Sequence, residues 1–189
     1  MARRRYYYRR TIRPKQKWAI NNVDVRILPN QQVTISGNNN AFYYQIVAAN
    51  ASRVSTGSGD SATAITSSAQ ILKTGRFKFK GCIPNAQNYF SFTVFIAYVP
   101  EGYTFTTGSV SDQNIFYQHP EWVIGWTRKD YASVSQSNEI SITSRLKRNL
   151  NTGDGIIVGI LLGNTTTSDA VFSGSFVLQG TLSYCCRAN

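Results

Sequence analysis

The stretch RFKFKGCI, residues 76–83, alternates cations with apolar side chains and decides the fold class. Successive side chains of a β-strand point to opposite faces of a sheet, so Arg76, Lys78 and Lys80 share one face and two phenylalanines share the other. Neighbours on one face lie about 6.6 Å apart, and three like charges at that spacing repel unless water or an anion faces them. The stretch therefore predicts a strand with one buried apolar face and one face that water or nucleic acid covers.

Eight other runs carry strand signals, and turn residues such as Pro, Gly and Asn separate them. Most alternate with a period of two, whereas IIVGILL is continuously apolar, which is typical of a strand covered on both faces. One of the nine runs could be a short extra edge strand. No segment holds a 3.6-residue apolar stripe for three turns, so we expect helix in less than about 15% of the chain. The eight runs are VDVRIL (23–28), QVTIS (32–36), FYYQIVA (42–48), SFTVFIAYV (91–99), WVIGWTRKDY (122–131), EISITSRLK (139–147), IIVGILL (156–162) and SFVLQGTLSYC (175–185).

Two connections between these runs are long and rich in small or polar residues, at 50–70 and 100–121. Loops of this length in a compact domain are usually functional or exposed. Eight or nine antiparallel strands with such uneven connections favour an all-β, eight-stranded antiparallel jelly roll over a meander barrel. The composition changes once, near residue 18. The sequence therefore predicts a basic arm at 1–17 and one β domain at 18–189.

The arm, MARRRYYYRRTIRPKQK, holds eight of the chain's 20 Lys and Arg residues and no acid. The remaining 172 residues carry 12 cations and 9 acids, so most of the net charge of +11 lies in the arm. Like charges keep such a segment disordered when free and suit it to a polyanion. Arginines neutralise phosphates, and tyrosines stack on unpaired bases, which favours single strands over duplex. The candidate nucleic-acid-binding residues are Arg3, Arg4, Arg5, Tyr6, Tyr7, Tyr8, Arg9, Arg10, Arg13, Lys15 and Lys17, together with Arg76, Lys78 and Lys80.

Residues that could carry catalysis or bind a metal are few. The one histidine, His119, stands beside a proline, and the nine acids are scattered singly, so no acid–base pair is indicated. The three cysteines lack CxxC spacing, and the adjacent Cys185 and Cys186 would point to opposite faces of a strand. The sequence therefore indicates neither an enzyme nor a metal or other cofactor. No run approaches 18 apolar residues, so membrane insertion is not expected.

The chain resembles the capsid proteins of small circular single-stranded DNA viruses that encode a replication initiator, the circovirus-like group. The likeness consists of patterns that run through most of the chain and are specific only as a set. They are RRRYYYRR (3–10), LKTGRFKFKG (72–81), FTVFIAYVPEG (92–102), HPEWVIGWTRKDY (119–131) and SRLKRNLNTGDGIIVGIL (144–161).

The resemblance implies a virion protein with an eight-stranded jelly roll that forms an icosahedral (T=1) shell of about 60 copies. It also implies that the arm lies inside with the single-stranded DNA genome and carries the signal read by a host nuclear import receptor, so that assembly takes place in the host nucleus. It assigns no catalytic residue and no residue to a host surface receptor. In such a shell we expect the loop 50–70 on the outer surface. In the run 91–99, one face carries Phe95 and Val99 among small residues and is less polar than a monomer needs, so we expect this face where subunits meet.

Other functions stay open at this stage. The arm is shorter than in circoviruses proper, so the capsid of a small RNA satellite virus fits as well. A cellular β-barrel that binds single-stranded nucleic acid is another alternative, although its cations would be spread over the barrel face. The arm could also be an import signal without a packaging role. The sequence does not decide which face of the sheet lines the interior.

Overall fold

The computed structural model describes residues 18–28, 33–35, 40–50, 71–84, 90–105, 108–110, 115–130, 139–164, 172–174 and 176–188. The predicted arm at 1–17 and all but the first residue of the loop 50–70 lie outside these ranges. The elements are β1 (Ala19–Ile27), β2 (Val33–Ile35), β3 (Asn40–Ala49), β4 (Leu72–Cys82), β5 (Phe90–Val99), β6 (Gly108–Val110), α1 (Ile115–Gln118), η1 (Pro120–Trp122), β7 (Val123–Asp130), β8 (Glu139–Leu150), β9 (Gly155–Asn164), β10 (Phe172–Gly174) and β11 (Leu178–Ala188).

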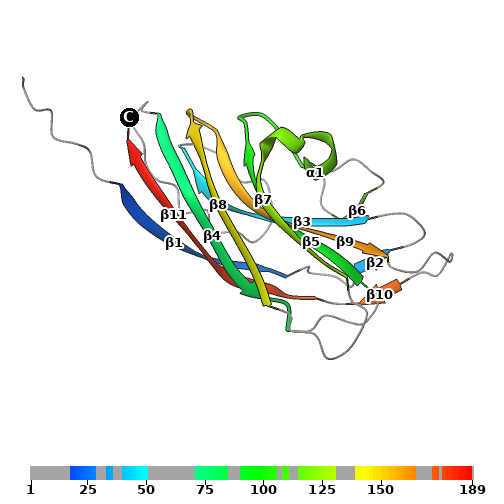
Figure 1. Cartoon of the computed structure of the whole chain (residues 1–189). Helices are drawn as coiled ribbons and strands as arrows, with labels where there is room; N and C mark the ends of the chain where they lie inside the picture. The colour runs from blue at the N-terminus through cyan, green and yellow to red at the C-terminus, as the bar shows by residue number, and fades with distance from the viewer. Residues whose placement is uncertain are drawn as a thin grey trace, which may run out of the picture.

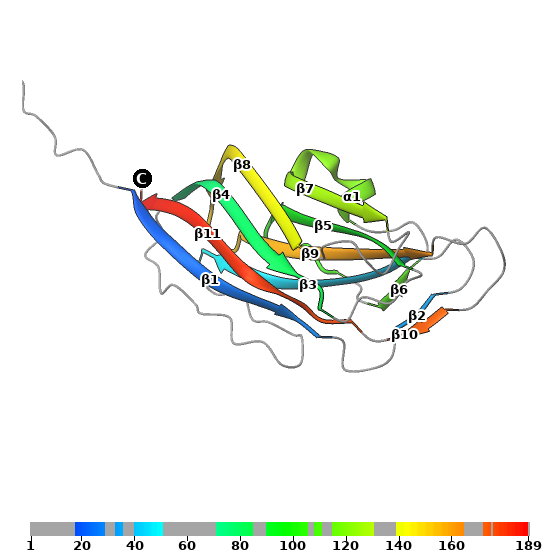
Figure 2. The same ribbon diagram turned by 60° about the horizontal axis from the view of Figure 1, so that its bottom comes forward.

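Eight long strands form two antiparallel sheets that face each other (Figure 1). One sheet has the order β1-β11-β4-β8, and the other has the order β6-β3-β9-β5-β7. The short strands β2 and β10 pair with each other at one end, and the start of β1 lies beside the end of β11 at the other (Figure 2). The only helical segments in the described residues are α1 and η1, of 4 and 3 residues. The prediction of a nearly all-β chain with little helix is confirmed.

The main core lies between the two sheets and is built from the inward side chains of both. In β4, Phe77 and Phe79 are fully buried, as the alternation predicted. Strand β9 is buried on both faces because Ile156 and Val158 enter this core while Ile157 enters a second cluster on the opposite face of the sheet. The prediction of a strand covered on both faces is therefore confirmed.

The second cluster corrects one expectation. The outward face of β5 presents Phe95, Ala97 and Val99, and all three are buried within the single chain. The connection 100–122 covers them, because its α1 residue Ile115 and several of its aromatic rings pack on this face of the sheet. Phe95 and Phe116, for example, have ring centroids 5.3 Å apart. The expectation that this face meets neighbouring subunits is wrong, since the chain covers it with its own long connection.

Several strand boundaries differ from the predicted runs. Strand β1 begins at Ala19 although its first residues are polar or exposed, because the whole strand pairs with β11 from Ala19 opposite Cys186 to Ile27 opposite Leu178. The last strand is shifted toward the C-terminus, to Leu178–Ala188, by the same pairing. The predicted short extra strand is β2, which belongs to neither main sheet.

The turn between β8 and β9 is held by a buried carboxylate. Asp154 is 4% exposed and accepts hydrogen bonds from the Tyr98 hydroxyl (2.8 Å), the Glu101 amide (3.0 Å) and the Asn151 amide (2.8 Å). Its backbone carbonyl also accepts from the Asn50 amide at 2.9 Å. Turn residues separate these two runs in the sequence, and the structure adds that this turn anchors the start of the connection 100–122.

Candidate nucleic-acid interface

The three predicted cations of β4 lie on the exposed face of the four-stranded sheet. Arg76, Lys78 and Lys80 are exposed, while the phenylalanines between them are buried. Strand β4 is an inner strand with β11 on one side and β8 on the other (Figure 2). The cations therefore stand in the middle of the sheet face rather than at its edge.

Hydroxyl groups flank two of these cations. Lys80 lies opposite Thr181 of β11 and Ser141 of β8, and Lys78 lies opposite Ser183 and Thr143. The row continues on β1, where the Ser183 hydroxyl donates to the Asn22 amide oxygen at 2.6 Å. A hydroxyl has one proton to donate, and the Thr181 hydroxyl likewise donates to the Asp24 carboxylate at 3.4 Å. Ser141 and Thr143 are therefore the hydroxyls beside these cations that can donate to a phosphate or sugar oxygen without neutralising the charge.

Cations outnumber acids on this face. Two acids, Asp24 on β1 and Glu139 at the start of β8, are exposed there. None of the exposed cations on this face forms an ion pair with another described residue. The one contact of this kind among the described residues joins His119 to Glu121, away from this face. The exposed cations of the four strands are Arg26, Arg76, Lys78, Lys80, Arg145 and Lys147.

A β-bulge interrupts β4 at Arg76. The register slips between Gly75 and Phe77 against β8, and against β11 between Ser183 and Cys185. Arg76 has a φ of 56°, and it is the one residue other than glycine with positive φ in the described ranges. A bulge of this kind adds a residue to one strand and re-aims its side chain. Gly75 and Arg76 therefore both lie toward the exposed face, which strict alternation would not allow.

A small pocket lies beside this bulge. Trp18, Gly75, Arg76 and Lys147 line a hollow of about 50 Å³. Because the pairing of β1 with β11 brings the two ends of the domain together, the guanidinium carbon of Arg187 lies 4.8 Å from the centre of the Trp18 ring. The Arg187 Nε is buried and has no hydrogen-bond acceptor within the described part of the chain. These five residues are called the root pocket below, since residue 18 directly follows the basic arm in the sequence.

The basic run RLKR at 145–148 is divided between the two faces of β8. Arg145 and Lys147 are exposed, whereas Arg148 is half-buried and its guanidinium donates to the carbonyl oxygen of Glu121. The same guanidinium lies 6.0 Å from the centre of the Tyr98 ring. Arg148 therefore joins the sheets structurally and does not add to the cationic face.

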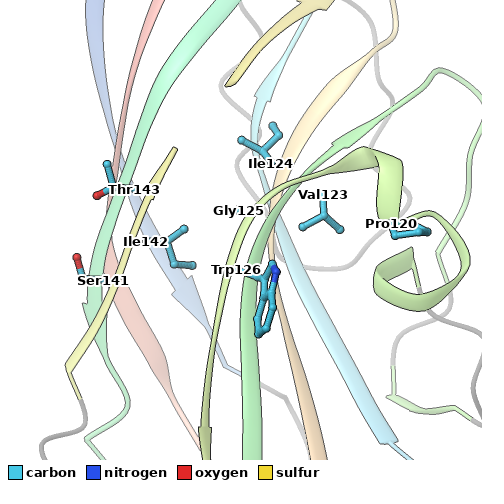
Figure 3. A pocket seen from close by; sticks show the side chains of 8 residues that line it. All are labelled: Pro120, Val123, Ile124, Gly125, Trp126, Ser141, Ile142 and Thr143. Carbon is cyan, nitrogen blue, oxygen red and sulfur yellow. The ribbon is translucent and has the colours of Figure 1, made fainter. Parts of the chain in front are cut away.

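A larger hollow lies at the edge of the sandwich, between β7 and β8 (Figure 3). It has a volume of about 560 Å³ and is lined by Pro120, Val123, Ile124, Gly125, Trp126, Ser141, Ile142 and Thr143, none of which titrates. Nearby, the His119 ring stacks on Trp122 with centroids 3.8 Å apart, and its Nδ1 lies 3.1 Å from a Glu121 carboxylate oxygen. A backbone hydrogen bond, aided by His119, lowers the pKa of Glu121. His119 is thus held by a ring stack and by its contact with the Glu121 carboxylate at a surface turn.

All three cysteines are free thiols. Cys185 is buried, whereas Cys186 packs partly against the main core and accepts a hydrogen bond from the Asn21 amide nitrogen at 2.8 Å. In the described ranges, no group of three or more His, Cys, Asp or Glu residues could hold a metal ion. No described helix is long and apolar enough to cross a membrane.

Sequence reasoning found the β4 cations but missed Trp18, Lys147 and Arg187 as one group. Gly75 beside a cation was the available signal for a bulge, because glycine inside a strand often marks one. The pairing of the first strand with the last carried no local signal. The arm candidates from Arg3 to Lys17 lie outside the described residues.

Comparison of the chain with protein-family models gives no match, and comparison with curated proteins gives none either.

Proposed function

We propose that this chain is the capsid protein of a small single-stranded DNA virus. In this proposal the β domain is a jelly roll that assembles into a closed shell, and the basic arm packages the genome. The proposal joins the resemblance noted above to the strand order and to the distribution of charge.

The strand pairing is the observation that carries the proposal. Among the eight long strands, the first pairs with the last (β1 with β11), the second with the seventh (β3 with β9), the third with the sixth (β4 with β8) and the fourth with the fifth (β5 with β7). Such nested pairing, divided between two facing sheets, is what a long folded-back ribbon gives when it rolls up as two Greek keys, and capsid jelly rolls have this arrangement. A meander barrel would pair neighbours in sequence throughout.

The arm supplies the charge for packaging. If the shell holds about 60 copies, eight cations per arm bring about 480 positive charges to the interior, enough for a strand of about 500 nucleotides. Each phosphate contact to a single strand adds a salt slope of about −0.7, so binding should weaken steeply as salt rises. The tyrosines add stacking on bases, which salt screens little.

The exposed cations of β4 support a second set of contacts with the packaged nucleic acid, in addition to those of the arm. Their side chains stand on the face of the four-stranded sheet, where hydroxyl residues flank two of them and none forms an ion pair with a described residue. We propose that this face lines the interior of the shell. A face that met other proteins would be expected to carry a less charged centre.

The experiment compares the full chain with a variant in which the eight arm cations are replaced by glutamine and the three tyrosines are kept. Particles of each are purified, and their nucleic acid is measured by absorbance and by nuclease-protected length. We expect the variant to form shells that are empty or hold little nucleic acid. Full loading without the arm cations would contradict the packaging mechanism and leave the arm as an import signal.

The nature of the protected nucleic acid separates the alternatives. Protected strands that resist ribonuclease and yield to deoxyribonuclease support the DNA virus, and the reverse supports the capsid of an RNA satellite virus. A chain that binds single strands but stays monomeric at every concentration would instead support a cellular nucleic-acid-binding protein.

A further inference from the structure

We infer that the root pocket binds a phosphate group, and that in the assembled protein this is a backbone phosphate of the packaged strand. The identity of the strand rests on the function proposed above, whereas the affinity of the pocket for phosphate does not. The pocket combines two lining cations with a third cation stacked on Trp18.

The electrostatics of the pocket favour an anion. Arg76 and Lys147 line it, and Lys73 lies opposite Arg187 in the pairing of β4 with β11. The acid nearest along the sheet face is Asp24, which lies in the row of Lys80, two strands across and four residues along from Arg76, and hence more than about 13 Å away. That separation exceeds the Debye length of about 8 Å at physiological salt, so Asp24 does little to neutralise the pocket.

The backbone conformation that places Arg76 at the pocket is energetically unfavourable. A φ of 56° is unfavourable for any residue with a Cβ, and glycine would adopt it without strain. Strained residues gather at functional sites, where the strained geometry positions a side chain. An arginine at this position of the bulge therefore indicates that its side chain is needed at the pocket more than an unstrained backbone is.

Two further features shape the pocket for a group larger than water. A Cβ on Gly75 would lie 3.1 Å from the Lys147 Cγ. The glycine therefore leaves space at the bottom of the pocket and lets the Lys147 side chain lie close to the backbone. The hollow of about 50 Å³ is several times the volume of about 10–15 Å³ that one water molecule needs. The space suits a tetrahedral oxyanion.

Arg187 lies over the ring of Trp18, which lines the pocket. A guanidinium stacked on an aromatic ring keeps its plane in a set orientation and leaves its edge for hydrogen bonds to phosphate. Its buried Nε has no acceptor among the described residues, so an oxygen supplied by a ligand would satisfy it. Because Trp18 directly follows the arm in the sequence, a strand that binds the arm can continue into the pocket.

The test uses the full chain, freed from nucleic acid at high salt, with a single-stranded oligothymidine as the probe. Arg76→Gly removes the side chain and the backbone strain together, so we expect its fold to be at least as stable as that of the unchanged chain. Arg26→Gln is the matched control, because it removes one exposed charge from the same sheet face away from the pocket. We expect Arg76→Gly to weaken binding about tenfold at 0.15 M salt, the loss of a charge-assisted contact, and Arg26→Gln to weaken it about twofold. Equal losses of affinity in the two variants would contradict a phosphate site in the root pocket.

A second readout separates this inference from the packaging function. Inorganic phosphate is titrated while tryptophan fluorescence is followed, and the Trp18→Phe variant identifies the part that comes from Trp18. We expect a saturable change that needs both Trp18 and Arg76, whether or not shells form or hold DNA. A response that is absent, or unchanged in Arg76→Gly, would overturn the inference even if the packaging experiment succeeds.

Discussion

Replacement of Asp154 by alanine should strongly destabilise the domain. The carboxylate accepts hydrogen bonds from the Tyr98 hydroxyl and from the Glu101 and Asn151 amides, at 2.8–3.0 Å, and is almost fully buried. Hydrogen bonds to charged groups contribute about 1.5–3 kcal/mol each, and three donors would lose their acceptor. Water can enter the truncated turn and satisfy part of them, so we expect a loss of about 3–5 kcal/mol, a large share of the stability of about 5–15 kcal/mol typical of a domain.

The assay is urea unfolding of Asp154→Ala, Asp154→Asn and Tyr98→Phe in the full chain. Asparagine keeps one acceptor oxygen and should lose about half as much free energy of unfolding as alanine, whereas Tyr98→Phe removes one donor and should lose about 1–2 kcal/mol. If Asp154→Ala loses no more than Tyr98→Phe, the carboxylate does not organise the turn and the reasoning is wrong.

Three further predictions concern stability. Arg76→Gly should raise the free energy of unfolding by about 0.5–1 kcal/mol because it relieves a positive φ, and a loss in the same urea assay would show that the conformation is unstrained. Burial, with a smaller contribution from Cys186, raises the pKa of Tyr184 to about 12, so between pH 10 and 12 the folded state binds more protons than the unfolded state. Stability should therefore fall as pH rises through that window, and unfolding titrations of Tyr184→Phe should show a shallower fall; equal slopes would count against it. Gly159→Ala should cost about 1–3 kcal/mol by thermal unfolding, because its Cβ would lie 2.6 Å from a ring carbon of Phe95; an unchanged melting temperature would mean that the ring moves freely.

Much of the fold followed from hydrophobic periodicity. The alternation at 76–83 predicted which residues are buried, because burial of Phe77 and Phe79 outweighs every local preference there. The continuous apolar run at 156–162 likewise predicted a strand covered on both faces. The start of β1 was not predictable in this way, since its first residues are exposed or polar and are held in the sheet by pairing with β11.

The missed features depend on partners that are distant in sequence. The donors to the Asp154 carboxylate from Tyr98 and Glu101 lie 56 and 53 residues away, so the turn pattern alone could not reveal them. The cover on Phe95 comes from a connection whose helical segments are only 4 and 3 residues long, too short to show a period. The root pocket needs the first and last strands to meet beside a bulge, and neither event leaves a contiguous motif.

The central claim, that the chain is a capsid protein, is tested most directly by electron microscopy of the purified full chain at low and moderate salt. The account predicts closed shells of one uniform diameter that contain protected single-stranded DNA. A chain that remains monomeric, or that forms only irregular aggregates under all conditions, would contradict it.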